Sequence, residues 1–158
     1  MNRSLSTLRS LVPTLYIPGL MINLGNGLLV PILPLYAAGF EISYGLIGLI
    51  LAGEALGTLI ADVPTGMMQK RFGNKQVMMT GFVVSIISTL LLFFVQSIWI
   101  VFLLRITAGF GKAMYGVSMH IYIANHVELF QRGKAIAIFG GVHRLGGFIG
   151  PALGGIIR

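Results

Sequence analysis

The sequence predicts an all-α protein that crosses a membrane several times. Of its 158 residues 56% are hydrophobic and only 9% are charged, mean hydropathy is +0.90, and the apolar residues gather in five long runs. Soluble domains carry about 25% charged residues. Crossing roughly 30 Å of hydrocarbon takes about 20 apolar residues. The runs therefore predict membrane spans over residues 12–36, 44–68, 77–95, 98–125 and 135–157.

The positions of Lys and Arg predict how these spans are oriented. Residues 1–11 contain two arginines, and the first span is too long and too rich in proline for a cleaved signal peptide. Basic residues recur after the second and fourth spans, whereas the other two connections lack them. By the positive-inside rule, segment 1–11 is a cytoplasmic N-terminus and 12–158 is a multi-pass domain. The basic residues of those connections are Lys70, Arg71, Lys75, Arg132 and Lys134.

The residues give no support to several other classes of function. The net charge of +7 follows the topology and forms no basic stripe with interleaved aromatics, so no nucleic-acid partner is expected. Cysteine is absent, which excludes disulfides and thiolate sites. His120, His126 and His143 have no carboxylate at metal-ligand spacing, and no nucleotide-binding, hydrolase or zinc-protease motif occurs. We therefore expect no catalytic residue, metal or cofactor, and no enzymatic activity.

Two parts of the chain resemble each other. The second predicted span can be overlaid on the fifth, which aligns Gly57 with Gly146, and the first on the fourth, which aligns Gly27 with Gly116. Because the two halves begin on opposite sides of the bilayer, this is an inverted repeat of three spans, an arrangement typical of secondary transporters. The third span has no counterpart. We therefore expect an incomplete second repeat, with a sixth helix missing after Arg158.

A charged turn that contains glycine connects the second and third predicted spans. It reads Asp62-Val-Pro-Thr-Gly66-Met-Met-Gln-Lys70-Arg71-Phe-Gly73-Asn74-Lys75. This turn resembles the signature loop of the major facilitator superfamily. We expect Gly66 to allow a close helix contact and Gly73 to adopt the positive φ of a tight turn.

The turn departs from the family pattern at two positions. Lys70 stands where the family usually has an acid, and Asn74 stands where it usually has an arginine. The gating ion pairs that the family builds on that acid are therefore in question. Asp62, one turn before the first glycine, either supplies the missing carboxylate or simply meets Lys70 or Arg71.

Two basic residues lie inside the fourth predicted span. Residues 105–113 read Arg-Ile-Thr-Ala-Gly-Phe-Gly-Lys-Ala and include Gly109. They resemble the arginine-containing motif of the same superfamily, which implies that Arg105 takes part in proton or substrate coupling. Lys112 lies on nearly the same helix face, and a cation at this depth costs about 2.5–3.5 kcal/mol on insertion scales. Two of them predict a polar cavity, unless Arg105 snorkels outward or caps a neighbouring helix.

The fifth predicted span is rich in glycine. It reads Gly146-Gly-Phe-Ile-Gly150-Pro151-Ala-Leu-Gly154-Gly155, which resembles the glycine and proline motif of this helix in drug/proton antiporters. Glycine at every fourth position forms a groove for close helix packing, and Pro151 removes a backbone donor and bends the helix. Packing alone explains the same spacing, so antiport is one of two interpretations.

Polar side chains are expected to meet near the membrane midplane, where secondary transporters bind substrate. Glu54 is expected to carry the proton, because a carboxylate in a partly dry site binds protons more readily, and Arg105, Lys112 or Arg144 would neutralise it. The alternative is a permanent pair of Glu54 with Arg144. The candidates for substrate binding and proton coupling are Asn23, Asn26, Glu54, Arg105, Lys112, His143 and Arg144.

The resemblance implies the N-terminal half of a major facilitator carrier in the plasma (inner) membrane. It would move a small solute by alternating access, with proton coupling and in the direction of efflux. Its expected partners are the lipid bilayer, the solute, H⁺, and a missing C-terminal half or another membrane subunit. Two alternatives are a truncated relic that transports nothing and a scaffold whose glycine faces bind other membrane helices.

Overall fold

The computed structural model describes residues 11–38 and 43–156, and helices account for nearly all of them. No strand occurs in these two ranges. Five of the described helices are long and apolar enough to cross a membrane, which confirms the predicted all-α class. In chain order the elements are the π-helical turn η1 (Val12–Tyr16), α2 (Ile17–Ala38), α3 (Tyr44–Phe72), α4 (Asn74–Leu91), the 3₁₀ turn η2 (Leu92–Phe94), α5 (Ile98–His126) and α6 (Leu129–Ile156).

Two helices extend well beyond the predicted spans. α3 continues to Phe72 where the span was predicted to end at 68, and α6 begins at Leu129, ahead of the predicted start at 135. The predictions followed apolar runs, whereas a helix can continue into water with polar residues in its end turns. Residues 1–10 and 39–42 lie outside the described residues, and the second range includes most of the outer turn predicted over 40–44.

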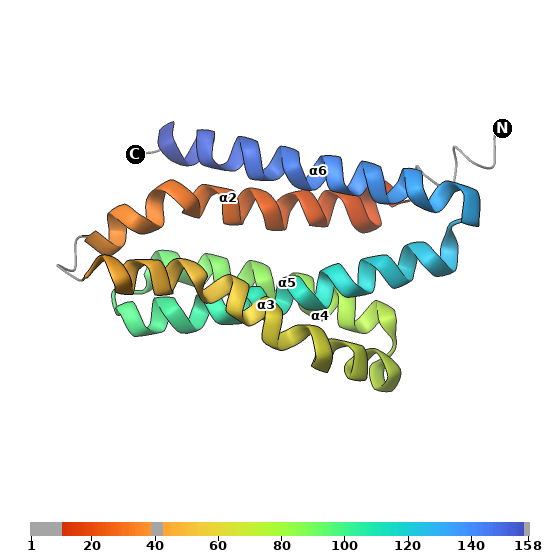
Figure 1. Ribbon diagram of the computed structural model, residues 1–158, viewed down its shortest axis with the longest axis horizontal. Coiled ribbons are helices and arrows are strands. Elements are labelled where there is room, and N and C mark those ends of the chain that lie inside the picture. Colours follow the sequence, from red (N-terminus) through yellow and green to blue (C-terminus); the bar gives the residue numbers. More distant parts are fainter. Residues whose placement is uncertain (1–10, 39–42, 157–158) are drawn as a thin grey trace.

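The helices form two groups. α2 and α6 lie side by side and run in the same direction, and α3 runs in the same direction as α5 in the second group, which also contains α4 (Figure 1). The second and fourth spans are thus paired in one group, and the fifth and first in the other. This is the pairing that the predicted inverted repeat requires, because the repeat relates the second span to the fifth and the fourth to the first.

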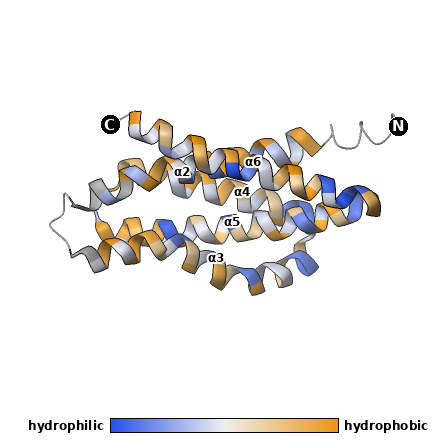
Figure 2. Cartoon of the chain, turned by 45° about the horizontal axis from the view of Figure 1, so that its top comes forward, coloured by the Kyte–Doolittle hydropathy of each residue, from blue (hydrophilic) through white to orange (hydrophobic). Residues whose placement is uncertain are grey.

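The outer surface of the bundle is apolar over most of its length. Large side chains such as Val63, Phe94 and Phe148 are exposed, which suits contact with lipid tails. Hydrophilic residues gather where α3 ends and α6 begins (Figure 2). We call this region the basic end of the bundle. Its basic residues are Lys70, Arg71, Arg132 and Lys134.

Close backbone contact joins α3 to α5. A Cβ atom added at Gly57 would overlap the carbonyl oxygen of Ile106, and one added at Gly109 would overlap the carbonyl oxygen of Glu54. Small residues of this kind let membrane helices approach until their backbones touch. The same device joins α4 to α5, where a Cβ on Gly81 would lie 2.7 Å from the Gly111 carbonyl oxygen.

The glycines of α6 make the corresponding contact with α2. A Cβ added at Gly150 would lie 2.6 Å from the Cα atom of Gly27, and one added at Gly154 would lie 2.6 Å from the carbonyl oxygen of Leu28. At Gly146 the nearest atom would be the Asn23 Cβ atom at 2.8 Å. The spacing of four residues therefore forms a groove that α2 fills.

Other glycines of the motifs behave differently. A Cβ added at Gly66 or Gly155 would meet no atom within 4 Å, so the close contact expected at Gly66 is absent among the described residues. α3 still meets α5 near this end, because Gln69 donates to the Ser118 hydroxyl, but the side of the helix toward which a Cβ of Gly66 would point has no neighbouring atom from the described residues. Gly73 has φ = +82°, the positive value expected for the tight turn, and it joins α3 to α4.

Substituting Gly57→Ala should destabilise the bundle, because the new methyl group forces α3 away from α5. We expect a loss of about 1–3 kcal/mol in the free energy of unfolding, measured by titration with SDS in mixed micelles. The matched control is Gly48→Ala on the same helix, where an added Cβ meets nothing within 4 Å. The control should be neutral or slightly stabilising, because alanine favours helix more than glycine does. Equal effects of the two substitutions would contradict close packing at Gly57.

Candidate functional site

Glu54 lies in the interior of α3, far from both ends of the helix. At about 1.5 Å per residue it is roughly 15 Å from the start of α3, while Arg105 and Lys112 are roughly 10 and 21 Å from the start of α5. Because α3 and α5 run in parallel, the carboxylate lies at a depth between those of the two cations. Lys112 follows Arg105 by two helical turns, so both project from the same side of α5.

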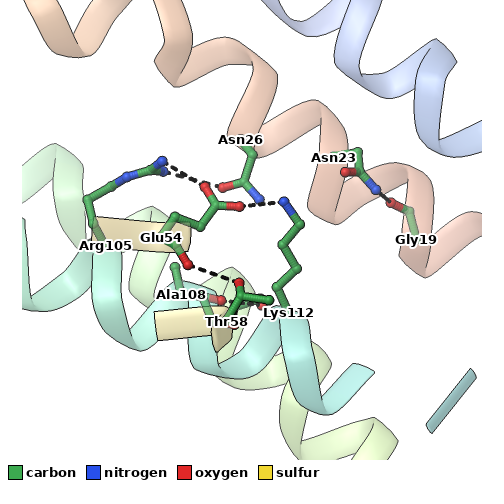
Figure 3. A network of polar contacts seen from close by, with 10 residues as sticks. Gly19, Asn23, Asn26, Glu54, Thr58, Arg105, Ala108 and Lys112 are labelled. Atoms are coloured by element: carbon green, nitrogen blue, oxygen red, sulfur yellow. Dashed lines mark hydrogen bonds and ion pairs between the residues drawn. The ribbon is translucent and has the colours of Figure 1, made fainter. Parts of the chain in front are cut away.

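The Glu54 carboxylate forms an ion pair with each of these cations (Figure 3). Arg105 Nη2 lies 2.7 Å from Glu54 Oε2, and Lys112 Nζ lies 2.6 Å from Glu54 Oε1. The side chains of Glu54 and Arg105 are 10% and 8% exposed, whereas that of Lys112 is 33% exposed. Arg105 is thus the enclosed partner, and Lys112 is the partner that remains accessible.

The backbone contact between α3 and α5 brings these charges together. Thr58, one turn after Glu54, donates its hydroxyl to the carbonyl oxygens of Glu54 at 2.9 Å and Gly109 at 3.2 Å. On the far side, Arg105 Nη1 lies 3.5 Å from the Asn26 side-chain oxygen, which links α5 to α2. Arg105 Nε has no hydrogen-bond partner among the described residues. We call Asn26, Glu54, Arg105 and Lys112 the charge cluster.

A cavity of about 320 Å³ lies beside Lys112. It is lined by side chains from α2, α3, α5 and α6, and its aromatic walls are Tyr115 and Phe139. Tyr115 donates its hydroxyl to the carbonyl oxygen of Leu15. The polar residues that line the cavity are Asn23, Thr58, Asp62, Lys112, His120 and His143.

The other three residues that were predicted to lie near the membrane midplane differ in their burial and contacts. Asn23 is buried and donates its side-chain amide to the Gly19 carbonyl oxygen at 2.7 Å. His143 lines the cavity, with its ring 6.3 Å from that of Phe139. Arg144 is exposed and forms no ion pair in the described part of the chain. The alternative pair of Glu54 with Arg144 is therefore absent. Successive residues of a helix point about 100° apart, so Arg144 does not share the direction of His143, which faces the cavity.

The charged residues predicted for the turn between the second and third spans lie mostly in the last turns of α3, apart from the charge cluster. Asp62 is exposed and, among the described residues, pairs with neither Lys70 nor Arg71. The Arg71 guanidinium lies 5.3 Å from the centre of the Phe72 ring. Asp62 is about 12 Å further along α3 than Glu54.

Within the described ranges, no group of three His, Asp or Glu side chains could hold a metal ion.

The sequence analysis missed the side-chain hydrogen bonds that join the end of α3 and the start of α4 to α5. Gln69 donates to the Ser118 hydroxyl at 2.9 Å, and the Asn74 side-chain amide donates to the Ser118 carbonyl oxygen at 3.0 Å. Only Thr58 gave a usable signal, because it follows Glu54 by one turn on the same helix face. The Ser118 contacts join residues far apart in the sequence, and no local pattern marks them.

Comparison with known proteins gives one family. The family model described as Major Facilitator Superfamily matches residues 15–157. Multidrug resistance protein 2 of Bacillus subtilis is 28% identical over 85% of this chain and 34% of its own length. An uncharacterised MFS-type transporter of Methanocaldococcus jannaschii is 31% identical over 85% of this chain and 35% of its own length. The class B tetracycline resistance protein of Escherichia coli is 31% identical, with coverages of 84% and 33%. This chain spans about a third of the length of these curated relatives.

Substituting Glu54→Gln should destabilise the bundle, because Arg105 is then buried without a counter-ion. We expect a loss of about 2–3 kcal/mol, at the low side of the cost of breaking a buried pair because Lys112 is partly exposed. The double variant with Arg105→Gln should recover part of this loss, since no buried charge is left unpaired.

The measurement is a double-mutant cycle by SDS titration in mixed micelles. Glu128→Gln is the control, because it removes an exposed carboxylate and should change stability by no more than about 0.5 kcal/mol. If Glu54→Gln unfolds at the same SDS fraction as the parent, the pair with Arg105 does not stabilise the protein.

Proposed function

This chain belongs to the Major Facilitator Superfamily, and we propose that it forms the N-terminal part of a secondary transporter that moves a small organic solute by alternating access. The observation that carries the proposal is the Glu54 carboxylate, held between Arg105 and Lys112 inside a membrane-spanning bundle. Ionisable groups at this depth are costly, and in membrane proteins they mark pathways for substrates or protons. A bundle built only for packing would have no need of three charges there.

The chain is a multi-pass membrane protein whose five helices fit the N-terminal bundle of the family fold. We further propose that it lies in the cell membrane with the basic end in the cytoplasm. Lys70, Arg71, Arg132 and Lys134 support this orientation, because short cytoplasmic connections are enriched in basic residues.

We propose that a proton competes with Arg105 and Lys112 for the Glu54 carboxylate. Without a proton, the carboxylate binds Arg105 and Lys112 and offsets the repulsion between them. With a proton, both ion pairs are lost, and Lys112 is free to turn toward the cavity. A proton therefore changes the contact between α3 and α5, where Gly57 and Gly109 already bring the backbones together. Such a two-state element is what coupling between proton and solute requires.

The relatives support export of an organic solute as the direction and class of transport. One relative is described as a multidrug resistance protein and another as a tetracycline resistance protein. A transporter can contribute to such resistance by moving the compound out of the cell. We therefore propose efflux, with the inward movement of protons as its energy source.

A role as a scaffold for other membrane helices receives less support. That alternative requires glycine faces that are free to bind a partner. Gly146, Gly150 and Gly154 instead pack against α2, and Gly57 packs against α5. These glycines are used inside the chain, whereas a Cβ added at Gly147 or Gly155 of α6 would meet no atom within 4 Å.

The test is proton-coupled flux in proteoliposomes that contain the full-length gene product. The probes are ethidium as a cation, tetracycline, and 1-naphthalenesulfonate as an anion, each with an imposed pH gradient. We expect at least one probe to accumulate with the parent protein. Glu54→Gln should reduce this accumulation by about tenfold or more, while downhill equilibration of the same probe continues, because the solute pathway is intact.

Glu128→Gln serves as the matched control and should accumulate the probe as the parent protein does, since its carboxylate is exposed at the junction of α5 and α6. Undiminished accumulation with Glu54→Gln would reject Glu54 as the coupling residue. Absence of flux for every probe would reject the proposed transport of these solute classes.

A further inference from the structure

A groove of about 600 Å³ lies at the basic end of the bundle, where η1, α2 and α4 begin and α5 ends (Figure 1). We call it the α4 groove. No residue of the charge cluster lines it, and among the described residues it shares only Tyr115 with the cavity beside Lys112. Apart from Tyr115 and Tyr122, its polar lining residues are Thr14, Asn74, Lys75, Asn125 and His126.

The α4 groove opens onto the lipid-facing surface of the bundle. Met79 and Val83 line the groove and are exposed. Ile87 and Leu90 are exposed further along the same face of α4. Because Lys75, Met79, Val83 and Ile87 follow one another at every fourth position, they form one stripe along the helix. A molecule in the bilayer can therefore reach the groove from the side.

The lining of the α4 groove changes from polar to apolar along the helix axis. Asn74 and Lys75 are the first two residues of α4, and the last two residues of α5 lie beside them in the lining. Met79 and Val83 are about 6 and 12 Å further along α4 than Lys75. The polar part thus lies at the end of the membrane span and the apolar part lies at the depth of the hydrocarbon. This order matches the head and the tail of a phospholipid.

Lys75 gives the polar part a positive charge without a counter-ion. No carboxylate lines the groove in the described part of the chain, and Lys75 is exposed and forms no ion pair with the described residues. The Asn74 amide already donates to the Ser118 carbonyl oxygen at 3.0 Å, and His126 Nδ1 lies 3.0 Å from the Tyr122 carbonyl oxygen. Lys75, whose ammonium group has three donors, is therefore the strongest partner for an anion in this groove.

Aromatic rings from two helices make the groove concave. The His126 ring stacks on the Tyr122 ring with their centres 4.1 Å apart, and the Phe82 and Tyr115 rings lie 6.4 Å apart. Pro18 adds a wall from the start of α2. A lipid in the groove contacts three helices, so it gains more dispersion contacts than the surface of a single helix offers.

We propose that the α4 groove binds an anionic glycerophospholipid, with its phosphate on the Lys75 ammonium and an acyl chain along Met79 and Val83. Basic pockets between membrane helices at the cytoplasmic side bind anionic headgroups. A zwitterionic lipid gains less, because its own ammonium group is repelled by Lys75. The inference goes beyond the proposed function, since the groove faces lipid and its occupation does not require transport.

The test is equilibrium binding of lipid to the full-length gene product in detergent micelles, with the bound lipid counted by native mass spectrometry. The probes are dimyristoyl phosphatidylglycerol, which is anionic, and dimyristoyl phosphatidylcholine, which has the same chains and no net charge. We expect the parent protein to bind the anionic lipid more tightly. Glycerophosphoglycerol, which is the same headgroup without acyl chains, should not displace it at equal concentration.

Variants locate the preference at Lys75. Lys75→Gln should weaken binding of phosphatidylglycerol about fivefold, which is the contribution of one basic side chain near the membrane surface, and should leave phosphatidylcholine binding unchanged. Lys75→Arg should retain the preference. Lys134→Gln removes an exposed lysine at the same end of the bundle that does not line the groove, and it should bind as the parent does.

Three results would overturn the proposal. Equal affinity of the parent protein for the two lipids does so without any variant. A preference that survives in Lys75→Gln, or that falls equally in Lys134→Gln, would assign the binding to the basic surface in general. Displacement by glycerophosphoglycerol would show that a soluble phosphate compound, and not a lipid, occupies the groove.

Discussion

The bundle depends on the close approach of helix backbones. Inside a membrane, helices gain little by covering apolar side chains, because lipid tails are equally apolar, so association relies on packing and hydrogen bonds. In this chain Gly57 and Gly109 bring α3 against α5, and Gly27 and Gly150 bring α2 against α6. The described helices are thus paired by contacts that no larger residue would permit.

The charges in the interior follow from this packing. Because α3 and α5 run in parallel with their backbones in contact, the Glu54 carboxylate reaches both cations of α5. Burial of three charges becomes possible when each has a partner of opposite sign. The pairs are unequal, since Arg105 is enclosed and Lys112 borders a cavity. This inequality distinguishes the enclosed ion pair from the one that borders the cavity.

The sequence alone determined the class of the protein and the order of its membrane spans along the chain. Apolar runs of sufficient length predict spans, and the pattern of residues in the turn at 62–75 and in 105–113 identifies the family, because both depend on residues that are close together in the chain. It also singled out Glu54, since a carboxylate inside an apolar run is visible without a structure. The positive φ of Gly73 could be predicted for the same reason, as a tight turn is a local feature.

Only the tertiary structure decided which residues meet. Sequence spacing left Arg105, Lys112 and Arg144 as possible partners of Glu54, and the packing of α3 on α5 selects the first two. It also separates Gly57, which contacts another helix, from Gly66, which does not. A sequence pattern gives the face and approximate depth of a residue on its own helix. The contact also depends on the position and rotation of the neighbouring helix, which are set by the bundle as a whole.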